Sequence, residues 1–302
     1  MRLPDFLIIG AMKAGTTTLF ADLGANPGCY FPRDKEPGDL ARDEVLTEAG
    51  RAAYARHFEG APSGALLGEA STVYTKRPDF ERCAERARRV LGPDLKLLYI
   101  VRDPISRALS QHYHEWSAGE LDIADASEAI RSVPRILEYS RYAMQLEPWL
   151  DAFGSENLMA VRFEDYIADR ASGCERVSRF LGLEPRTDLI ESAAHNKGDE
   201  KMVLRGPLKA LWNSWPYQKL VRPVLGSSAA SGLKSAISRR MPKAPPRPAK
   251  PSSDVLAWAR TQVEPDLARL PELLGAGAPA WPDRSTLASS RGPVEPAGGS
   301  DR

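Results

Sequence analysis

The sequence predicts an α/β fold with a single domain, in which helices flank a central, mostly parallel sheet. Short apolar runs alternate with segments of helical periodicity along most of the chain, and this alternation is typical of β-α-β units. Residues 97–101 are apolar at consecutive positions, as a strand that is buried on both faces must be. The chain has 302 residues and a hydrophobic content of 42%, which is enough for one large core.

The individual elements follow from these runs. The predicted strands are residues 6–9, 66–70, 95–101 and 158–163. Helical periodicity predicts helices at 17–25, 80–91, 105–116, 142–153 and 171–181, and a weaker one at 121–130. A proline-rich stretch at 241–253 cannot join a helix or a sheet and is expected to be a loop, after which a last helix covers residues 254–274. We expect one domain over residues 1–285 and a disordered polar tail over 286–302.

Composition excludes several classes of protein. The chain has 41 basic and 40 acidic residues, so we expect no nucleic-acid polymer as a partner. The arginines of segment 80–90 alternate with glutamates, which favours a solvated helix face: Arg82, Arg86, Arg88 and Arg89. Three widely spaced cysteines without a C-x-x-C pair predict neither a zinc site nor a disulfide framework. Because no apolar stretch approaches 18 residues and no signal peptide precedes the first strand, we predict a cytoplasmic protein without a transmembrane segment.

The loop after the first predicted strand is the most informative segment. Residues 10–18 read Gly-Ala-Met-Lys-Ala-Gly-Thr-Thr-Thr, and a predicted helix begins within them. A strand, a glycine-containing turn and a helix N-terminus form a site for anions, because backbone N–H groups and the helix dipole point at the ligand. Lys13 and the threonine hydroxyls add donors. The alternative interpretation is a simple strand-to-helix turn with a solvated lysine.

The spacing separates this loop from an ordinary P-loop. In G-x-x-x-x-G-K-[ST] the lysine directly follows the second glycine, whereas Thr16 holds that position here and the lysine is Lys13. We therefore predict a P-loop-like element whose cation reaches a different part of a nucleotide. Walker-type enzymes also need an acidic residue at a neighbouring strand end to hold Mg²⁺, but Arg102 stands there, with Asp103 next.

Arg102 defines a second candidate anion site. Ligands of open α/β sheets bind beyond the carboxyl ends of strands, so Arg102 is expected at the same edge as the Lys13 loop. Ser110 lies eight residues further along the predicted helix, and a guanidinium with a hydroxyl suits a phosphate. Two separated anion sites fit a nucleotide with both a 5′ and a 3′ group. Taken alone, Arg102 and Asp103 would be interpreted as a surface ion pair.

Several motifs, in order, resemble those of sulfotransferases that use 3′-phosphoadenosine 5′-phosphosulfate (PAPS), in particular the heparan-sulfate branch and its bacterial relatives. Residues 6–17 resemble the family's 5′-phosphosulfate loop, and residues 101–110 its 3′-phosphate motif. Lys35-Glu36 resembles its K-E pair, residues 68–74 its G-E-A-S-x-x-Y segment, and residues 195–198 the loop that closes over the nucleotide. The aromatic that often follows the K-E pair is missing, since Pro37 and Gly38 stand there.

The resemblance implies an enzyme that moves a sulfuryl group from PAPS, without a metal ion, to a hydroxyl of a carbohydrate, a lipid or another small acceptor. It implies that Glu36 is the general base. Lys13 is expected to stabilise the charge on the leaving 5′-phosphate. His114 is the rival base, because it lies four residues beyond Ser110 and could share that helix face, and His195 is a weaker option. The expected donor-binding residues are Lys13, Ala14, Gly15, Thr16, Thr17, Thr18, Arg102, Ser110, Lys197 and Gly198. The expected acceptor-side residues are Glu36, Glu69, Ser71 and Tyr74.

Two other functions stay open at this point. A P-loop kinase or NTPase with a displaced lysine would require Mg²⁺ and a triphosphate. A nucleotide-binding module without catalysis would keep both anion sites but would tolerate substitution of Glu36 and His114. The alternative for Glu36 is an ion pair with Lys35 in a surface loop. The sequence does not identify the acceptor or the oligomeric state, because loops graft substrate pockets onto a shared fold.

Overall fold

A computed structural model of the chain describes residues 2–33, 35–190 and 246–275. Its centre is a five-stranded sheet in the order β2-β3-β1-β4-β5, in which all neighbouring strands are parallel. The strands are β1 (Phe6–Gly10), β2 (Cys29–Tyr30), β3 (Leu66–Ala70), β4 (Lys96–Val101) and β5 (Leu158–Arg162). The predicted α/β fold with a parallel sheet is confirmed.

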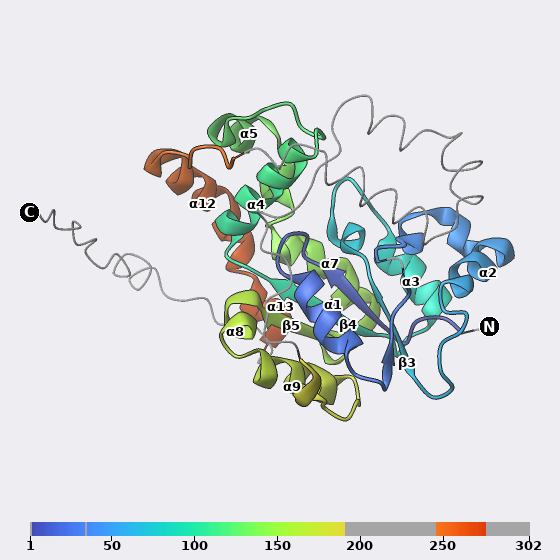
Figure 1. The fold of residues 1–302 in the computed structure, drawn as a ribbon. Coiled ribbons are helices and arrows are strands. Elements are labelled where there is room, and N and C mark those ends of the chain that lie inside the picture. The colour runs from blue at the N-terminus through green and yellow to red at the C-terminus, as the bar shows by residue number, and fades with distance from the viewer. Residues whose placement is uncertain (1, 34, 191–245, 276–302) are drawn as a thin grey trace, which may run out of the picture.

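Helices cover both faces of this sheet (Figure 1). Helix α1 packs against α9 on one face, and α3 packs against α7 on the other. The helices up to the end of β5 are α1 (Thr16–Gly24), α2 (Glu48–Arg56), α3 (Cys83–Leu91), α4 (Pro104–Ser117), α5 (Ala126–Ser132), α6 (Arg135–Glu138) and α7 (Tyr142–Phe153). Those that follow are α8 (Phe163–Ala168), α9 (Arg170–Phe180), α12 (Ser253–Leu267) and α13 (Leu270–Leu274).

The strand order places a ligand site between two strand ends. From β1 the chain crosses to β2 and β3 on one side, whereas from β4 it crosses to β5 on the other side. Ligands of open α/β sheets bind beyond the carboxyl ends of the strands at such a switch of direction. The loop after β1, which carries Lys13, and the residues after β4, which begin with Arg102, come into contact at this point.

The differences from the predicted elements have local causes. Strand β2 is only two residues long, and α2 buries little of its length apart from Tyr54 and Ala55, so neither gives a clear apolar period. The helix predicted at 121–130 is instead α5, whose first turn Asp125 caps by accepting hydrogen bonds from two backbone N–H groups. The helix predicted at 254–274 is divided into α12 and α13. Residues 246–252 belong to no helix or strand, as the proline-rich stretch predicts, while residues 241–245 of that stretch lie outside the described residues.

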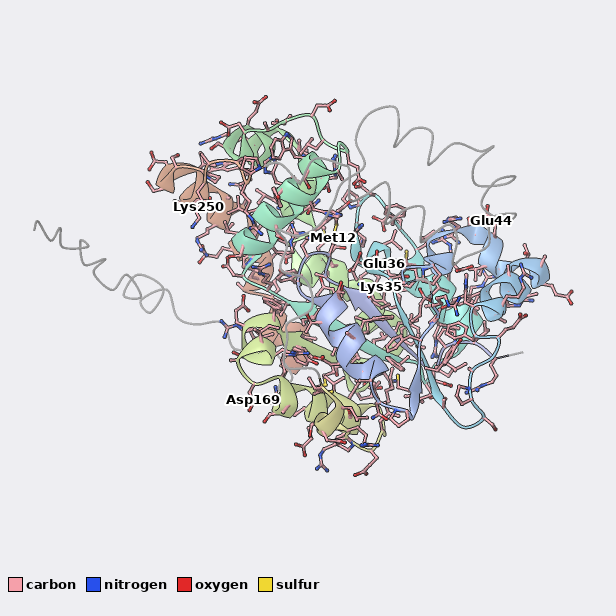
Figure 2. All side chains as sticks on the ribbon, viewed as in Figure 1. Met12, Lys35, Glu36, Glu44, Asp169 and Lys250 are labelled. Carbon is pink, nitrogen blue, oxygen red and sulfur yellow. The ribbon has the colours of Figure 1, made fainter. Side chains whose placement is uncertain are left out.

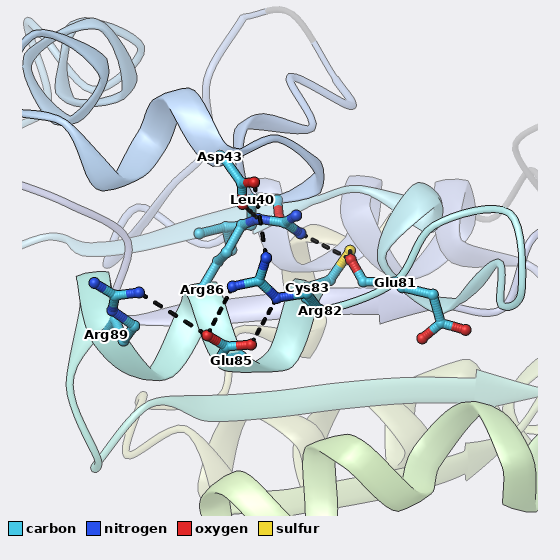
Figure 3. Close-up of polar contacts among 8 residues, drawn as sticks. All are labelled: Leu40, Asp43, Glu81, Arg82, Cys83, Glu85, Arg86 and Arg89. Atoms are coloured by element: carbon cyan, nitrogen blue, oxygen red, sulfur yellow. Dashed lines mark hydrogen bonds and ion pairs between the residues drawn. The ribbon is translucent and has the colours of Figure 1, made fainter.

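The expectation of a solvated arginine face is wrong for Arg86, which is 7% exposed. Its guanidinium pairs with Asp43 (Nε–Oδ1 2.7 Å) and donates to the carbonyl oxygens of Leu40 (3.3 Å) and Glu81 (2.8 Å) (Figure 3). These contacts fasten the short 3₁₀ helices η1 (Asp39–Ala41) and η2 (Asp43–Leu46) to α3. Arg86 therefore anchors the segment that directly follows Glu36.

Two further expectations concern membrane-spanning helices and the C-terminal tail. No helix among the described residues has both the length and the apolar character needed to cross a bilayer. The predicted tail at 286–302 lies outside the described residues, so the domain boundary at 285 stays a prediction.

Candidate active site

The loop after β1 forms a tight turn that opens onto the first turn of α1. Lys13 adopts a left-handed conformation (φ 65°), and Gly15 does so at the N-cap (φ 103°). A Cβ atom at residue 15 would lie 2.3 Å from the ring of Phe163, so only glycine fits there. Ala14 and Thr18 are buried on either side. No side chain caps α1, and its first N–H groups therefore point toward a ligand position.

Two threonine hydroxyls of this turn face a second lysine, which the sequence analysis does not assign to the site. Lys35 Nζ donates to Thr17 Oγ1 (3.0 Å) and Thr16 Oγ1 (3.4 Å). It also lies 3.5 Å from Glu36 Oε1. Figure 2 labels Lys35 and Glu36 together with Met12 of the loop. The segment after β2 thus brings a cation and a carboxylate to the edge of the candidate phosphosulfate site.

Glu36 is held from its backbone and from its side chain. It adopts a left-handed conformation (φ 64°), which is uncommon for a residue other than glycine and marks a strained turn. Its N–H donates to the carbonyl oxygen of Ala70 (3.1 Å), at the end of β3. Thr72 Oγ1 donates to Glu36 Oε2 (3.1 Å). The ion pair expected from the alternative interpretation exists, yet the Glu36 side chain is still 41% exposed and accessible to a ligand.

Arg102 lies directly beyond β4 and reaches across to the Lys13 loop. Its Nη1 donates to the carbonyl oxygen of Lys13 (3.3 Å), and its guanidinium lies 5.0 Å from the centre of the Phe163 ring. The backbone of Arg102 is fixed by the Tyr142 hydroxyl, which donates to its carbonyl oxygen (2.8 Å). The guanidinium is half-buried. The structure therefore brings Arg102 and the Lys13 loop together, as the shared sheet edge predicts.

Asp103, the residue that a metal–triphosphate enzyme would need, is engaged by the protein itself. Its Oδ1 accepts from the Ser106 N–H (2.8 Å) and caps α4. Its Oδ2 lies 3.4 Å from Nη1 of Arg260. Across the described ranges, no group of three or more acidic, histidine or cysteine residues could hold a metal ion.

Ser110 and His114 lie one helical turn apart on α4, and both are half-buried. Helix α4 begins two residues after Arg102, with Ser110 near its middle and His114 in its last turn. The remaining predicted site residues lie outside the described residues: His195, Lys197 and Gly198.

Glu69, Ser71 and Tyr74 form a buried cluster behind the Glu36 turn. The exposed fractions of these residues are 0%, 0% and 1%. Glu69 Oε1 accepts from Ser71 Oγ and from the Tyr74 hydroxyl, both at 2.6 Å, and Oε2 accepts from the Tyr54 hydroxyl. Burial raises the pKa of Glu69 above its ordinary value, against the lowering effect of these hydrogen bonds. In this structure the three residues contact one another rather than an open surface.

A buried arginine that the sequence analysis does not assign to the site supports the loop from α4. Arg107 is fully buried and donates to Gln111 Oε1 (2.7 Å), Ser140 Oγ (2.6 Å) and the carbonyl oxygen of Ile136 (2.6 Å). Its Nη1 also reaches the carbonyl oxygen of Met12 (3.4 Å). Burial lowers the pKa of Arg107. The i,i+4 spacing of Arg107 and Gln111, and the place of Arg107 within the motif at residues 101–110, are signals in the sequence that could have indicated this support.

Comparisons with known proteins agree with this geometry. Residues 84–202, which include Arg102 and Ser110, match the family model described as a sulfotransferase domain. Over this segment the chain is similar to the sulfotransferase family. It is 27% identical over 210 residues to heparan sulfate glucosamine 3-O-sulfotransferase 3A1 of Mus musculus, covering 61% of this chain and 47% of that protein. It is 24% identical over 290 residues to carbohydrate sulfotransferase 15 of Rattus norvegicus, covering 74% and 52%.

The fold is also that of a solved family member. The sulfotransferase from Alicyclobacillus acidocaldarius superposes with a TM-score of 0.61 at 23% identity, covering 91% of this chain and 96% of that one. The expected resemblance to sulfotransferases and the expected fold are therefore confirmed. The chain spans about half the length of the two curated relatives named above, so their acceptors and activities are not transferred to it by the comparison alone.

Proposed function

We propose that this sulfotransferase moves a sulfuryl group from PAPS to a hydroxyl of a carbohydrate, a lipid or another small acceptor. The observation that carries the proposal is the junction at the sheet edge, where Arg102 reaches the Lys13 loop (Nη1 to the Lys13 carbonyl oxygen, 3.3 Å). Two anion-binding groups then lie at the ends of β1 and β4. A nucleotide with both a 5′ and a 3′ anionic group matches this arrangement, whereas a nucleotide with only a 5′ group uses half of it.

The proposed donor site divides between the two loops. The 5′-phosphosulfate would lie at the N-terminus of α1, on Lys13, the N–H groups of residues 15–17 and the hydroxyls of Thr16 and Thr17. The N–H groups of Ala14 and Thr18 already donate to the carbonyl oxygens of Ala11 (3.1 Å) and Gly15 (3.0 Å). The 3′-phosphate would lie on Arg102 and Ser110, since a guanidinium offers two parallel donors to a phosphate. Lys197 and Gly198 stay proposed nucleotide contacts on the strength of the motif alone.

The proposed reaction is an in-line transfer between two oxygens. The acceptor oxygen attacks sulfur, the bond between sulfur and the bridging oxygen breaks, and adenosine 3′,5′-bisphosphate leaves with the bond's electron pair. Lys13 neutralises the charge that grows on the 5′-phosphate, and Glu36 takes the proton of the acceptor hydroxyl. Preorganised donors at developing charge often contribute more to catalysis than any other group, and a positioned base adds about 10²–10⁴-fold. The proposal requires no metal ion, and Asp103 is engaged by Ser106 and Arg260.

His114 remains the rival base, because it lies on α4 one turn beyond Ser110. A carbohydrate is supported as the acceptor class by the relatives whose names include heparan sulfate and carbohydrate, while lipids and other small molecules stay open. A cytoplasmic location stays a prediction.

The test is a transfer assay with PAPS over carbohydrate, lipid and phenolic acceptors, alongside thermal shift with adenosine 3′,5′-bisphosphate and with ATP and Mg²⁺. We expect stabilisation by the bisphosphate and transfer to at least one acceptor class. Stabilisation by ATP and Mg²⁺ alone would favour a kinase or NTPase. Stabilisation by the bisphosphate without transfer to any acceptor would favour a binding module without catalysis.

A further inference from the structure

The turn that presents Glu36 is held from behind by two buried hydroxyl groups. Both Glu36 and Gly38 adopt left-handed conformations, with φ of 64° and 72°. A strained turn of this kind persists only where the surrounding structure fixes it. The N–H of Gly38 donates to Ser71 Oγ (3.1 Å), and the N–H of Leu40 donates to the Tyr74 hydroxyl (3.3 Å). These two bonds fix the backbone on the carboxyl side of Glu36.

Each of these two hydroxyls donates its single proton, and both donate to the same acceptor, a carboxyl oxygen of Glu69. A hydroxyl has a single O–H and accepts at its lone pairs. Because Ser71 Oγ and the Tyr74 hydroxyl accept from the turn, they donate to Glu69 Oε1, each at 2.6 Å. Glu69 lies in β3, paired with Leu7 of β1 at the centre of the sheet. The direction of both hydroxyl bonds is therefore set by a carboxyl group that the sheet holds rigidly.

The other oxygen of Glu69 provides an internal comparison. Oε2 accepts from the hydroxyl of Tyr54, which comes from α2. Tyr54 and Tyr74 are both fully buried tyrosines that donate to Glu69. Only the Tyr74 hydroxyl also accepts a hydrogen bond from the turn after Glu36, at the Leu40 N–H.

We propose that Ser71 and Tyr74 are positioning residues for Glu36, and that Glu69 orients their hydroxyls. In this arrangement the three residues act on the reaction through the Glu36 turn and do not touch the acceptor. The inference rests on the proposed function, in which Glu36 is the general base. It replaces, for these three residues, the expectation that they contact the acceptor.

The experiment compares Tyr74→Phe with Tyr54→Phe in the full chain. Each substitution removes one buried hydroxyl and one bond to Glu69, so the two variants perturb the core similarly. Only Tyr74→Phe leaves the Leu40 N–H without its acceptor. The measurements are kcat and KM for an acceptor that the wild-type protein sulfates, the Kd for adenosine 3′,5′-bisphosphate, and hydrogen exchange of the backbone amides of Glu36, Gly38, Asp39 and Leu40.

We expect Tyr74→Phe to lower kcat by about 10- to 100-fold, because a small displacement of a reacting group costs about this much. Its Kd for adenosine 3′,5′-bisphosphate should stay at the wild-type value, and its Leu40 amide should exchange faster. Tyr54→Phe should keep the wild-type kcat and the slow Leu40 exchange. Glu69→Gln should keep most of the wild-type kcat and the slow Leu40 exchange, because the amide oxygen of glutamine can accept from both hydroxyls as Oε1 does.

Three outcomes would overturn the inference. Equal losses of kcat in the two tyrosine variants would mean that the cluster supports only the fold. A higher KM with an unchanged kcat in Tyr74→Phe would mean that Tyr74 contacts the acceptor. Unchanged exchange at Leu40 in Tyr74→Phe would show that the turn does not depend on this hydroxyl. The exchange measurement needs no turnover, so it tests whether Tyr74 holds the Glu36 turn even if the wild-type protein transfers no sulfuryl group. A failure of the proposed function is thereby distinguished from a failure of this support.

Discussion

Replacing Arg102 with alanine should weaken the binding of adenosine 3′,5′-bisphosphate much more than the binding of adenosine 5′-monophosphate. The two ligands differ only in the 3′-phosphate, which the account places on the Arg102 guanidinium. Arg102 also supports the Lys13 loop through the Lys13 carbonyl oxygen (3.3 Å) and stacks on Phe163 (5.0 Å). Loss of those two contacts should affect both ligands alike, because both have a 5′-phosphate.

The size of the difference follows from the site. A hydrogen bond to a charged group contributes about 1.5–3 kcal/mol, and each 1.4 kcal/mol changes Kd by about tenfold. Because the Arg102 side chain is only half-buried, solvent screens it, and we expect the lower part of this range. The Kd for the bisphosphate should therefore rise by about 10- to 30-fold more than the Kd for the monophosphate.

Isothermal titration calorimetry of both ligands, on the wild-type protein and on each variant, measures this difference. Arg260→Ala is the matched control, because Arg260 pairs with Asp103 (3.4 Å), the residue next to Arg102, yet has no proposed role in binding. It should leave both dissociation constants unchanged. Equal weakening of the two ligands in Arg102→Ala would refute the assignment of the 3′-phosphate to Arg102 and leave only a role in loop support.

Three further predictions concern the remaining groups of the site. Lys13→Ala should lower kcat by about 10²–10³-fold, with a smaller loss of nucleotide affinity, because its charge is needed mainly as the leaving group departs; unchanged turnover in a steady-state assay would exclude this role. Glu36→Gln should lower kcat by about 10²–10⁴-fold, and a rate near that of the wild type at every pH would move the base to His114. Burial raises the pKa of Glu69 above its ordinary value of 4.5. The folded state therefore keeps this proton to a higher pH than the unfolded chain does. Above pH 4.5 this difference lowers the free energy of unfolding of the wild-type protein as the pH rises. The stability of Glu69→Gln relative to the wild type, measured by urea unfolding, should therefore increase as the pH rises above 4.5; a difference that does not change with pH would contradict the buried, titrating carboxyl.

The sheet was predictable because its strands are short, apolar and regularly spaced. Strand β4 is buried at almost every position, and such a run has few alternatives to a central parallel strand. The local pattern does not predict the order of the strands. In any order, however, the carboxyl ends of parallel strands share one edge of the sheet. That rule alone was enough to place Arg102 beside the Lys13 loop, where the structure also has it.

The less predictable part of the site depends on contacts between distant segments. Lys35 faces Thr17 (3.0 Å) across the edge of the sheet. The K-E motif singles out Lys35-Glu36, but its local sequence does not show that this lysine reaches the threonines of the Lys13 loop. Buried Glu69 accepts a hydrogen bond from Tyr54 of α2, a helix whose weak apolar pattern does not predict it. Polar residues in a G-E-A-S segment therefore look like acceptor contacts until the fold shows that they face inward.

A crystal structure of the protein with adenosine 3′,5′-bisphosphate tests the central claim most directly. The account predicts the 5′-phosphate at the N-terminus of α1, within about 3 Å of Lys13 Nζ and the Thr17 hydroxyl, and the 3′-phosphate at the same distance from the Arg102 guanidinium. A nucleotide bound elsewhere, or bound with its 3′-phosphate out of reach of Arg102, would contradict it.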